Sequence, residues 1–203
     1  MTTTDPISGP LAGTAHADDA TVLARLHDRL EGSADVDVAY RLLDSPLGEL
    51  LVASTDRGVV RVGFAAAGHD AALEELATAI SPRVLRAPGR LDAAARQLEE
   101  YFAGRRRRFD LPLDLRLANG FRLEVVEHLG EVGYGETASY ARVAALVGRP
   151  RAVRAVGTAC ARNPLPVLVP CHRVVRSDGS VGEYAGGPAA KRALLALEAL
   201  GDG

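Results

Sequence analysis

The second half of the chain is organised around residues 139–161, which read SYARVAALVGRPRAVRAVGTACA. Ser139 is a natural N-cap for a helix over 140–147, because its hydroxyl can accept a hydrogen bond from an unpaired backbone N–H. Pro150 stands where a first-turn proline is tolerated, so a second helix is predicted over 151–161. Two short helices joined by a glycine turn are typical of a helix-turn-helix, although such pairs are also common in protein cores.

The charge of the chain is unevenly distributed. The whole chain has 24 Lys and Arg against 26 Asp and Glu, and this balance does not by itself indicate a nucleic-acid partner. Residues 137–177 contain no Asp or Glu but hold seven arginines: Arg142, Arg149, Arg151, Arg154, Arg162, Arg173 and Arg176. Such a surface attracts phosphates, because neutralising them releases counterions. Charge scattered by chance in an arginine-using protein is the alternative, and the complete absence of acids favours a binding face.

Upstream, apolar and polar residues alternate in short segments separated by tight turns. This pattern predicts an antiparallel meander of three strands over 36–42, 49–54 and 59–64. Helical patterns follow over 71–80 and 91–102, and prolines and a glycine separate and end them. Together these segments predict a small sheet with helices packed on it.

Four consecutive arginines, residues 105–108, follow the second of these helices. They fit either a nucleic-acid patch or a solvated connection, and the connection is the more common use of so short a charge run. We therefore expect an α+β protein of three parts. These are an extension with one helix over 1–35, a small antiparallel-sheet domain with helices over 36–115, and a mostly helical, winged-helix-like (helix-turn-helix) domain over 116–203.

The composition is that of an ordinary globular protein, with 47% hydrophobic and 25% charged residues. Its two cysteines, Cys160 and Cys171, are too few for a disulfide framework or a cysteine-zinc site, and we expect neither a metal nor another cofactor. The N-terminus lacks the basic and apolar regions of a signal peptide, and no apolar run approaches the roughly 20 residues that cross a bilayer. These features predict a cytoplasmic protein with no membrane partner.

A thiol stands beside an imidazole in residues 170–174 (PCHRV). The thiol of a free cysteine is mostly protonated at neutral pH, so a nucleophilic Cys171 needs a base or a positive field nearby. Adjacent side chains of an extended segment point to opposite sides, so His172 would act through a bridging water or a bend at Pro170. A buried, inert cysteine is the alternative, and a cysteine hydrolase would need an oxyanion hole, for which the sequence has no signal.

Several motifs resemble the O6-alkylguanine-DNA alkyltransferases, a family of DNA repair proteins. The resemblance is dense from about 121 to 200 and is carried by 135–140 (GETASY), 154–157 (RAVG), 163–174 (NPLPVLVPCHRV), 182–187 (GEYAGG) and 191–198 (KRALLALE). Looser matches lie at 40–48 (YRLLDSPLG) and 101–104 (YFAG). The resemblance implies irreversible, single-turnover transfer of an alkyl group from guanine O6 in double-stranded DNA to a cysteine of a monomeric protein.

The resemblance also implies roles for individual residues of the site. Cys171 matches the alkyl acceptor, His172 the residue that takes the thiol proton through a water, and Glu198 the carboxylate that orients the resulting imidazolium. Asn163 matches a residue that shapes the turn before the active-site segment. A non-catalytic sensor of alkylation damage or a DNA-binding regulator is the alternative, but alkyltransferase-like sensors lack an acceptor at the position of Cys171.

The target base must leave the duplex to be reached. Arg154 matches the arginine that fills the vacated space in the duplex. Tyr140 matches the tyrosine that helps to rotate the nucleotide, and it is a candidate proton donor to the guanine. The complete set of expected DNA contacts is Arg154, Arg151, Tyr140, Arg173 and Ser177.

The guanine pocket implied by the resemblance is built mainly from backbone. The backbone of the acceptor and of Val174 would bind the guanine edge, and a loop that carries Tyr184 and Ala185 would close over it. Ala185 departs from the serine that many members have, so only its backbone N–H remains for guanine O6. Val126 stands where a tryptophan is common, and we interpret Cys160 as a small apolar residue rather than a second acceptor.

Overall fold

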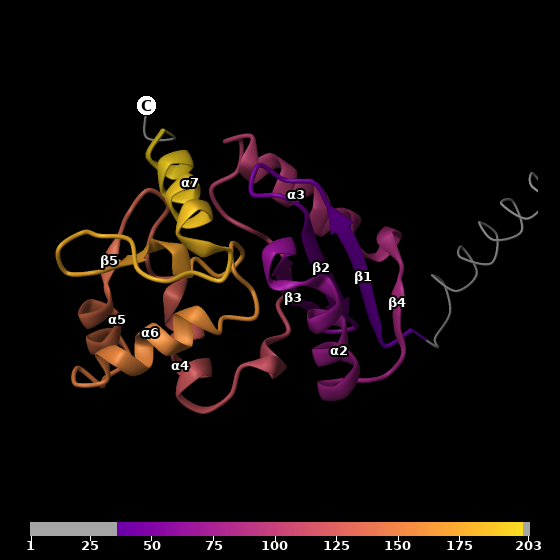
Figure 1. The fold of residues 1–203 in the computed structure, drawn as a ribbon, viewed down its shortest axis with the longest axis horizontal. Helices are drawn as coiled ribbons and strands as arrows, with labels where there is room; N and C mark the ends of the chain where they lie inside the picture. The colour runs from indigo at the N-terminus through magenta and orange to yellow at the C-terminus, as the bar shows by residue number, and fades with distance from the viewer. Residues whose placement is uncertain (1–35, 201–203) are drawn as a thin grey trace, which may run out of the picture.

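The computed structural model describes residues 36–200; the helix expected within 1–35 lies outside the described residues. The sheet comprises β1 (Val38–Leu43), β2 (Leu50–Thr55), β3 (Gly58–Phe64) and β4 (Val84–Arg86), in the order β3-β2-β1-β4 (Figure 1). The first three strands form the predicted antiparallel meander. The unpredicted strand β4 pairs in parallel with β1, so the complete sheet is mixed. The short β4 lies between Pro82 and Pro88, which mask its strand pattern.

Each face of the sheet is covered by one helix. The helical elements of this domain are η1 (Ala65–Ala67), α2 (His69–Ala79), η2 (Pro88–Leu91) and α3 (Asp92–Phe102). Successive side chains of a strand point to opposite faces. Leu51 therefore packs in the cluster that contains Leu76 of α2, whereas Leu50 packs in the cluster that contains Leu98 of α3. α2 and α3 confirm the two helical patterns of the sequence.

The second half is mostly helical, as predicted. Its elements are η3 (Leu115–Leu117), α4 (Gly120–Leu129), β5 (Ala138–Ser139), α5 (Tyr140–Leu146), α6 (Val153–Ala161), η4 (Cys171–Arg173), β6 (Val174–Val175) and α7 (Gly187–Ala199). β5 and β6 form a small parallel pair that joins the start of α5 to the segment after Cys171. Val126 is buried in α4, so an aliphatic side chain fills the place where a tryptophan is common.

The two consecutive helices α5 and α6 are present, but α6 is shorter than predicted. Ser139 caps α5 as expected, since its hydroxyl accepts a hydrogen bond from Arg142 N at 3.1 Å. α6 begins at Val153 after Ala152, whose N–H donates to Arg149 O at 2.8 Å. Pro150 therefore occupies a turn rather than the first turn of the helix, and Arg151 precedes α6. Proline suits the second position of such a turn as well as it suits a helix start, and the sequence does not separate the two.

The two domains share one hydrophobic core. Leu50 of the sheet and Leu165 of the segment before the cysteine belong to the same buried cluster. Gly186 lies against Phe64 of β3, where a Cβ atom would come within 2.8 Å of the ring. A larger residue at Gly186 would therefore push the two domains apart.

Candidate active site

Cys171 lies in a tight turn rather than in an extended segment. Residues Cys171–Arg173 form η4, and Arg173 N donates to Pro170 O at 3.0 Å. A bend at Pro170 is therefore present, and Cys171 and His172 do not lie in an extended segment. The segment that leads into the turn contains Val167 with a φ of 74°, a left-handed conformation that is unusual for a β-branched residue. Its neighbours must hold this strained segment in place.

Asn163 holds the segment through hydrogen bonds at both ends of its amide. Its oxygen accepts from Leu165 N at 3.0 Å, and its Nδ2 donates to Val169 O at 3.0 Å. Nδ2 also donates a hydrogen bond to the Sγ of Cys171 at 3.2 Å. Asn163 is buried, so these contacts are protected from water. This geometry agrees with the expected role of Asn163 in shaping the turn.

The thiol of Cys171 is protonated at neutral pH in this environment. Cys171 is only 1% exposed to solvent. Burial raises the pKa of the Cys171 thiol to about 11, although the hydrogen bond from Asn163 opposes this effect. A reactive thiolate therefore forms only if a neighbouring group takes the proton.

His172 is a neutral base held in one orientation. Its Nε2 lies 2.9 Å from Glu198 Oε1, so Nε2 carries the proton of the neutral ring. Burial lowers the pKa of His172, and the hydrogen bond to Glu198 offsets this effect only in part. Its Nδ1 is buried with no hydrogen-bond partner among residues 36–200. This nitrogen is thus a lone-pair acceptor for a proton.

Glu198, on α7, is an anion surrounded by donors. It accepts from Tyr101 Oη at 2.7 Å, from Arg173 Nε at 2.8 Å and Nη2 at 2.9 Å, and from Gly135 N at 3.3 Å. Burial alone would raise the pKa of Glu198, but the hydrogen bonds from His172, Arg173 and Tyr101 outweigh it and lower the pKa to about 2. The carboxylate therefore stays ionised and orients the imidazole.

The position of Arg173 corrects an expectation. Its guanidinium binds Glu198 through two nitrogens, and its Nη1 donates to Val132 O at 2.6 Å. Arg173 is only 8% exposed. It lies in the core beneath the site and is not a DNA contact, because its donors are already used inside the protein.

Two residues that form hydrogen bonds in the site, Tyr101 and Lys191, were not predicted as site residues from the sequence. Tyr101 comes from α3 of the other domain, and its YFAG motif indicated only membership of that domain. Lys191 of α7 is fully buried and donates to Val174 O at 2.5 Å, and its Nζ lies 3.5 Å from Tyr140 Oη. Two signals in the sequence marked Lys191: it is the single lysine of the chain, and it begins the 191–198 motif. Burial lowers the pKa of Lys191.

Tyr140 and Tyr184 lie near the cysteine from two different elements. Tyr184 is buried, with its ring 5.6 Å from that of Phe64 and 6.3 Å from that of His172. Tyr140 is half-buried at the start of α5, and burial raises its pKa, so its hydroxyl remains a donor. A Cβ at Gly182 would meet Tyr140 Oη at 2.3 Å, so glycine allows the loop to approach this hydroxyl. The half-buried Ala185 follows in the same loop.

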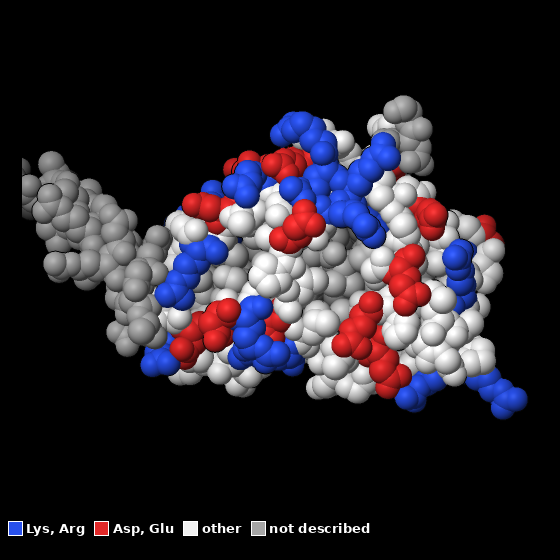
Figure 2. Space-filling view, turned by 180° about the vertical axis from the view of Figure 1, so that it is seen from behind, with Lys and Arg blue, Asp and Glu red and all other residues white. Residues whose placement is uncertain are grey.

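The remaining arginines of the acid-free stretch are on the surface. Arg151 is exposed just before α6, Arg154 is exposed in the first turn of α6, and Ser177 is exposed after β6. α5 and α6 lie side by side at one end of the molecule (Figure 1). On the face turned away in Figure 1, side chains of both signs lie along the upper and lower parts of the view, and a largely uncharged region separates them (Figure 2). The arrangement leaves the start of α6 available to a polyanion.

The arginine run 105–108 is partly neutralised by its own surroundings. Arg106 pairs with Glu100 at 2.7 Å and with Asp110 at 3.0 Å, and Arg107 lies over the ring of Tyr134 at 5.6 Å. These contacts agree with the interpretation of residues 105–108 as a connection between α3 and the next segment. Cys160 is buried at the end of α6, as a small apolar residue would be.

The described residues contain no helix that is long and apolar enough to cross a membrane. The same part of the chain has no cluster of three or more His, Cys, Asp or Glu placed to hold a metal ion. The contacts around Cys171 combine a thiol, an imidazole and a carboxylate, in a two-domain protein whose helix pair carries exposed arginines.

Comparisons with known proteins identify the family. Residues 38–115 match the 6-O-methylguanine DNA methyltransferase ribonuclease-like domain, and residues 120–200 match the DNA binding domain of the same methyltransferases. The chain is 39% identical over 159 residues to the methylated-DNA–protein-cysteine methyltransferase of Methanosarcina barkeri, covering 78% of this chain and 96% of that protein. It is 40% identical over 161 residues to the protein of the same name from Mycobacterium tuberculosis, covering 79% and 92%.

Solved structures lead to the same family. The crystal structure of Mycobacterium tuberculosis O6-methylguanine methyltransferase matches with a TM-score of 0.72 and 37% identity, over 82% of this chain and 95% of that chain. Mycobacterium tuberculosis OGT in complex with DNA matches with a TM-score of 0.69 and 37% identity, over 80% and 94%. The chain belongs to the 6-O-methylguanine DNA methyltransferase family, as its motifs indicated, and the expected α+β class is confirmed.

Proposed function

We propose that this protein repairs O6-alkylguanine in duplex DNA by moving the alkyl group irreversibly to the Sγ of Cys171. The proposal rests on the hydrogen bonds around Cys171 and around its neighbour His172. Asn163 donates to the sulfur, while the Nε2 of His172 is held by Glu198 and its Nδ1 has no partner within residues 36–200. A protonated nucleophile and an oriented neutral base are the groups that such a transfer needs.

The first step is removal of the thiol proton. The proton passes from Cys171 through a bridging water to Nδ1 of His172, and Glu198 stabilises the imidazolium that forms. The hydrogen bond from Asn163 stabilises the negative sulfur as it develops. Because the pKa of the resting thiol is about 11, little thiolate exists until a substrate is bound. Burial thereby protects the acceptor from unwanted reactions.

The second step forms one bond and breaks another. The sulfur lone pair attacks the alkyl carbon, the new S–C bond replaces the C–O6 bond, and that electron pair stays on the guanine. A proton from Tyr140 neutralises the guanine, and the positive Lys191 beside Tyr140 stabilises the phenolate left behind. The product cysteine is a thioether with no leaving group for water to displace, so each molecule acts once.

The base reaches the buried sulfur only outside the duplex. In the proposal Arg154 at the start of α6 fills the space of the rotated base, and Arg151 and Ser177 contact the backbone. Arginine insertion suits a minor-groove contact with little sequence preference. The backbone of Val174 and the loop with Tyr184 and Ala185 enclose the guanine.

The proposal further assigns the alkyl-acceptor role to residues 116–203 and a supporting role to residues 36–115. The protein would act as a monomer in the cytoplasm, where its thiol stays reduced. Both cysteines are free, which suits a cysteine that must remain a thiol until it meets a lesion.

Intact mass spectrometry tests the proposal directly. The full chain is incubated with a duplex that carries one O6-methylguanine, and we expect a mass gain of one methyl group that maps to Cys171. Cys171→Ser should show no gain and should still bind the duplex, whereas Cys160→Ser is the matched control that gains the methyl group. Binding without any mass gain in the wild-type protein would instead support a damage sensor, and a methylated Cys160 would contradict the assignment.

A further inference from the structure

A groove at the junction of the two domains brings three arginines together from different elements. It has a volume of about 320 Å³ and is lined by Arg61 of β3, Arg122 of α4 and Arg162, the residue after α6. The only carboxylate in its lining is Glu75, which pairs with Arg61 at 3.1 Å. Positive charge is therefore in excess in this groove.

The arginines of the groove have donors to spare. The Nε atoms of Arg61 and Arg122 are buried and have no hydrogen-bond partner in the described part of the chain. Arg122 uses Nη2 on Leu117 O, which fixes its direction. Arg162 is exposed, and its guanidinium forms no hydrogen bond or ion pair with residues 36–200. A buried donor without a partner costs free energy, and an anion beside these arginines would offset that cost through their positive charge and through the exposed donors of Arg162.

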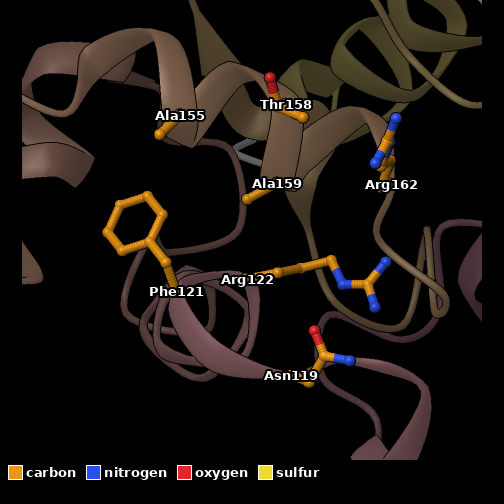
Figure 3. Close-up of a pocket in the computed structure, with 7 residues that line it drawn as sticks. All are labelled: Asn119, Phe121, Arg122, Ala155, Thr158, Ala159 and Arg162. Carbon is orange, nitrogen blue, oxygen red and sulfur yellow. The ribbon is translucent and has the colours of Figure 1, made fainter.

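A second pocket of about 380 Å³ adjoins the groove and shares Arg122 and Arg162. Figure 3 shows Phe121 and Ala155 at one side of this pocket, whereas the guanidinium of Arg122 extends away from Phe121 to the side of Arg162 and Asn119. One end of this second pocket is therefore apolar, and the other end is cationic. A phosphate joined to a sugar and a base has the same division between an anionic and an apolar part.

We propose that Arg61, Arg122 and Arg162 form a binding site for a phosphate group of a nucleotide or of a DNA backbone. Guanidinium groups are well suited to this ligand, because their planar donors match the oxygens of a phosphate. None of the three arginines has a role in the proposed alkyl transfer, and phosphate binding goes beyond that reaction. Its apolar neighbour at Phe121 accommodates the sugar or base attached to the phosphate.

The site is placed to connect the two domains to the acceptor segment. Asn163 and Ala185 belong to the lining of the same groove. Val62 of β3 donates a backbone hydrogen bond to Pro164 O at 2.9 Å, next to Asn163. A phosphate held by Arg61 on one domain and by Arg122 and Arg162 on the other would join both domains beside this segment. Binding should therefore stabilise the whole fold.

Thermal unfolding of the full chain with inorganic phosphate tests the site. Phosphate replaces chloride at constant ionic strength, and we expect the unfolding midpoint to rise and saturate. Arg162→Gln should weaken the apparent affinity about tenfold or more, because charge-assisted hydrogen bonds are lost. Arg122→Gln should do the same, whereas Arg96→Gln, which removes an exposed charge on α3, is the matched control and should leave the response unchanged. A midpoint that does not respond, or an equal affinity in Arg162→Gln and wild type, would overturn the proposal.

Binding of a labelled, undamaged duplex then separates the two sources of the phosphate. If the DNA backbone fills the site, inorganic phosphate at constant ionic strength weakens duplex binding in wild type more than in Arg162→Gln. If a free nucleotide fills it, phosphate leaves duplex binding unchanged and still raises the unfolding midpoint of the complex. Either result supports a phosphate site, and methyl transfer to Cys171 is measured separately.

Discussion

Arg173 and Arg154 come from the same acid-free stretch but lie in opposite environments. Arg173 is buried beneath η4 and binds Glu198 and a backbone carbonyl, whereas Arg154 is exposed at the start of α6. The donors of Arg173 are paired inside the protein. Arg154 is available to DNA. In the proposed function the reacting groups are therefore positioned before DNA binds, whereas the DNA contacts are assigned to residues that the fold leaves exposed.

Of the substitutions considered, Glu198→Gln should have the largest effect, because it removes the carboxylate at the centre of the buried network. Loss of the orienting anion removes the stabilisation of the imidazolium, so methyl transfer should slow by about a thousandfold or more, as in other triads that lose their carboxylate. Single-turnover kinetics measure the rate, and the final amount of methylated protein reports the folded fraction. A reduced amplitude with an unchanged rate would show that Glu198 is only structural.

Arg173→Met should destabilise the fold while Arg151→Met should not. Removing one partner of a buried ion pair leaves Glu198 uncompensated, and we expect a loss of about 3–5 kcal/mol in the free energy of unfolding. The matched exposed substitution should stay within about 0.5 kcal/mol. Urea unfolding under reducing conditions measures both. Equal losses in the two variants would contradict the distinction between the buried and exposed arginines.

The pH dependence of stability should reveal the same network. Burial lowers the pKa of His172 from an ordinary 6.5, so below that pH the unfolded chain binds a proton that the native histidine does not, and stability falls. Glu198, with a native pKa of about 2 against 4.5, adds a further loss as the pH falls from 4.5 towards 2. The carboxylate alone should contribute about 1–3 kcal/mol. Urea unfolding at several pH values should show this second loss in wild type and not in Glu198→Gln.

Arg154→Ala should affect only the encounter with duplex DNA. Filling the space of the rotated base offsets an unstacking cost of a few kcal/mol, so repair in a duplex should slow by roughly ten- to a hundredfold. Transfer from free benzylated guanine requires no base rotation and should be unchanged. The two rates are compared under single-turnover conditions. Equal losses on both substrates would place Arg154 in the chemistry instead.

Local patterns in the sequence were sufficient for most of the secondary structure. The meander, α2, α3 and the capped α5 follow from alternation, helical periodicity and turn residues, which act over a few positions. β4 was missed because it owes its place to pairing with β1, and α6 starts late because Pro150 suits a turn as well as a helix. The candidate site residues were reached through a motif match, and their contacts required the fold.

By itself the sequence determined the class of fold, the family, the candidate acceptor Cys171 and the acid-free stretch. Only the tertiary structure decided which arginine is committed to Glu198 and which faces solvent, since charge along the chain does not report burial. It also decided that Tyr101 reaches Glu198 across 97 positions. Such contacts depend on how two domains pack on one core, and a short-range pattern contains no information on that packing.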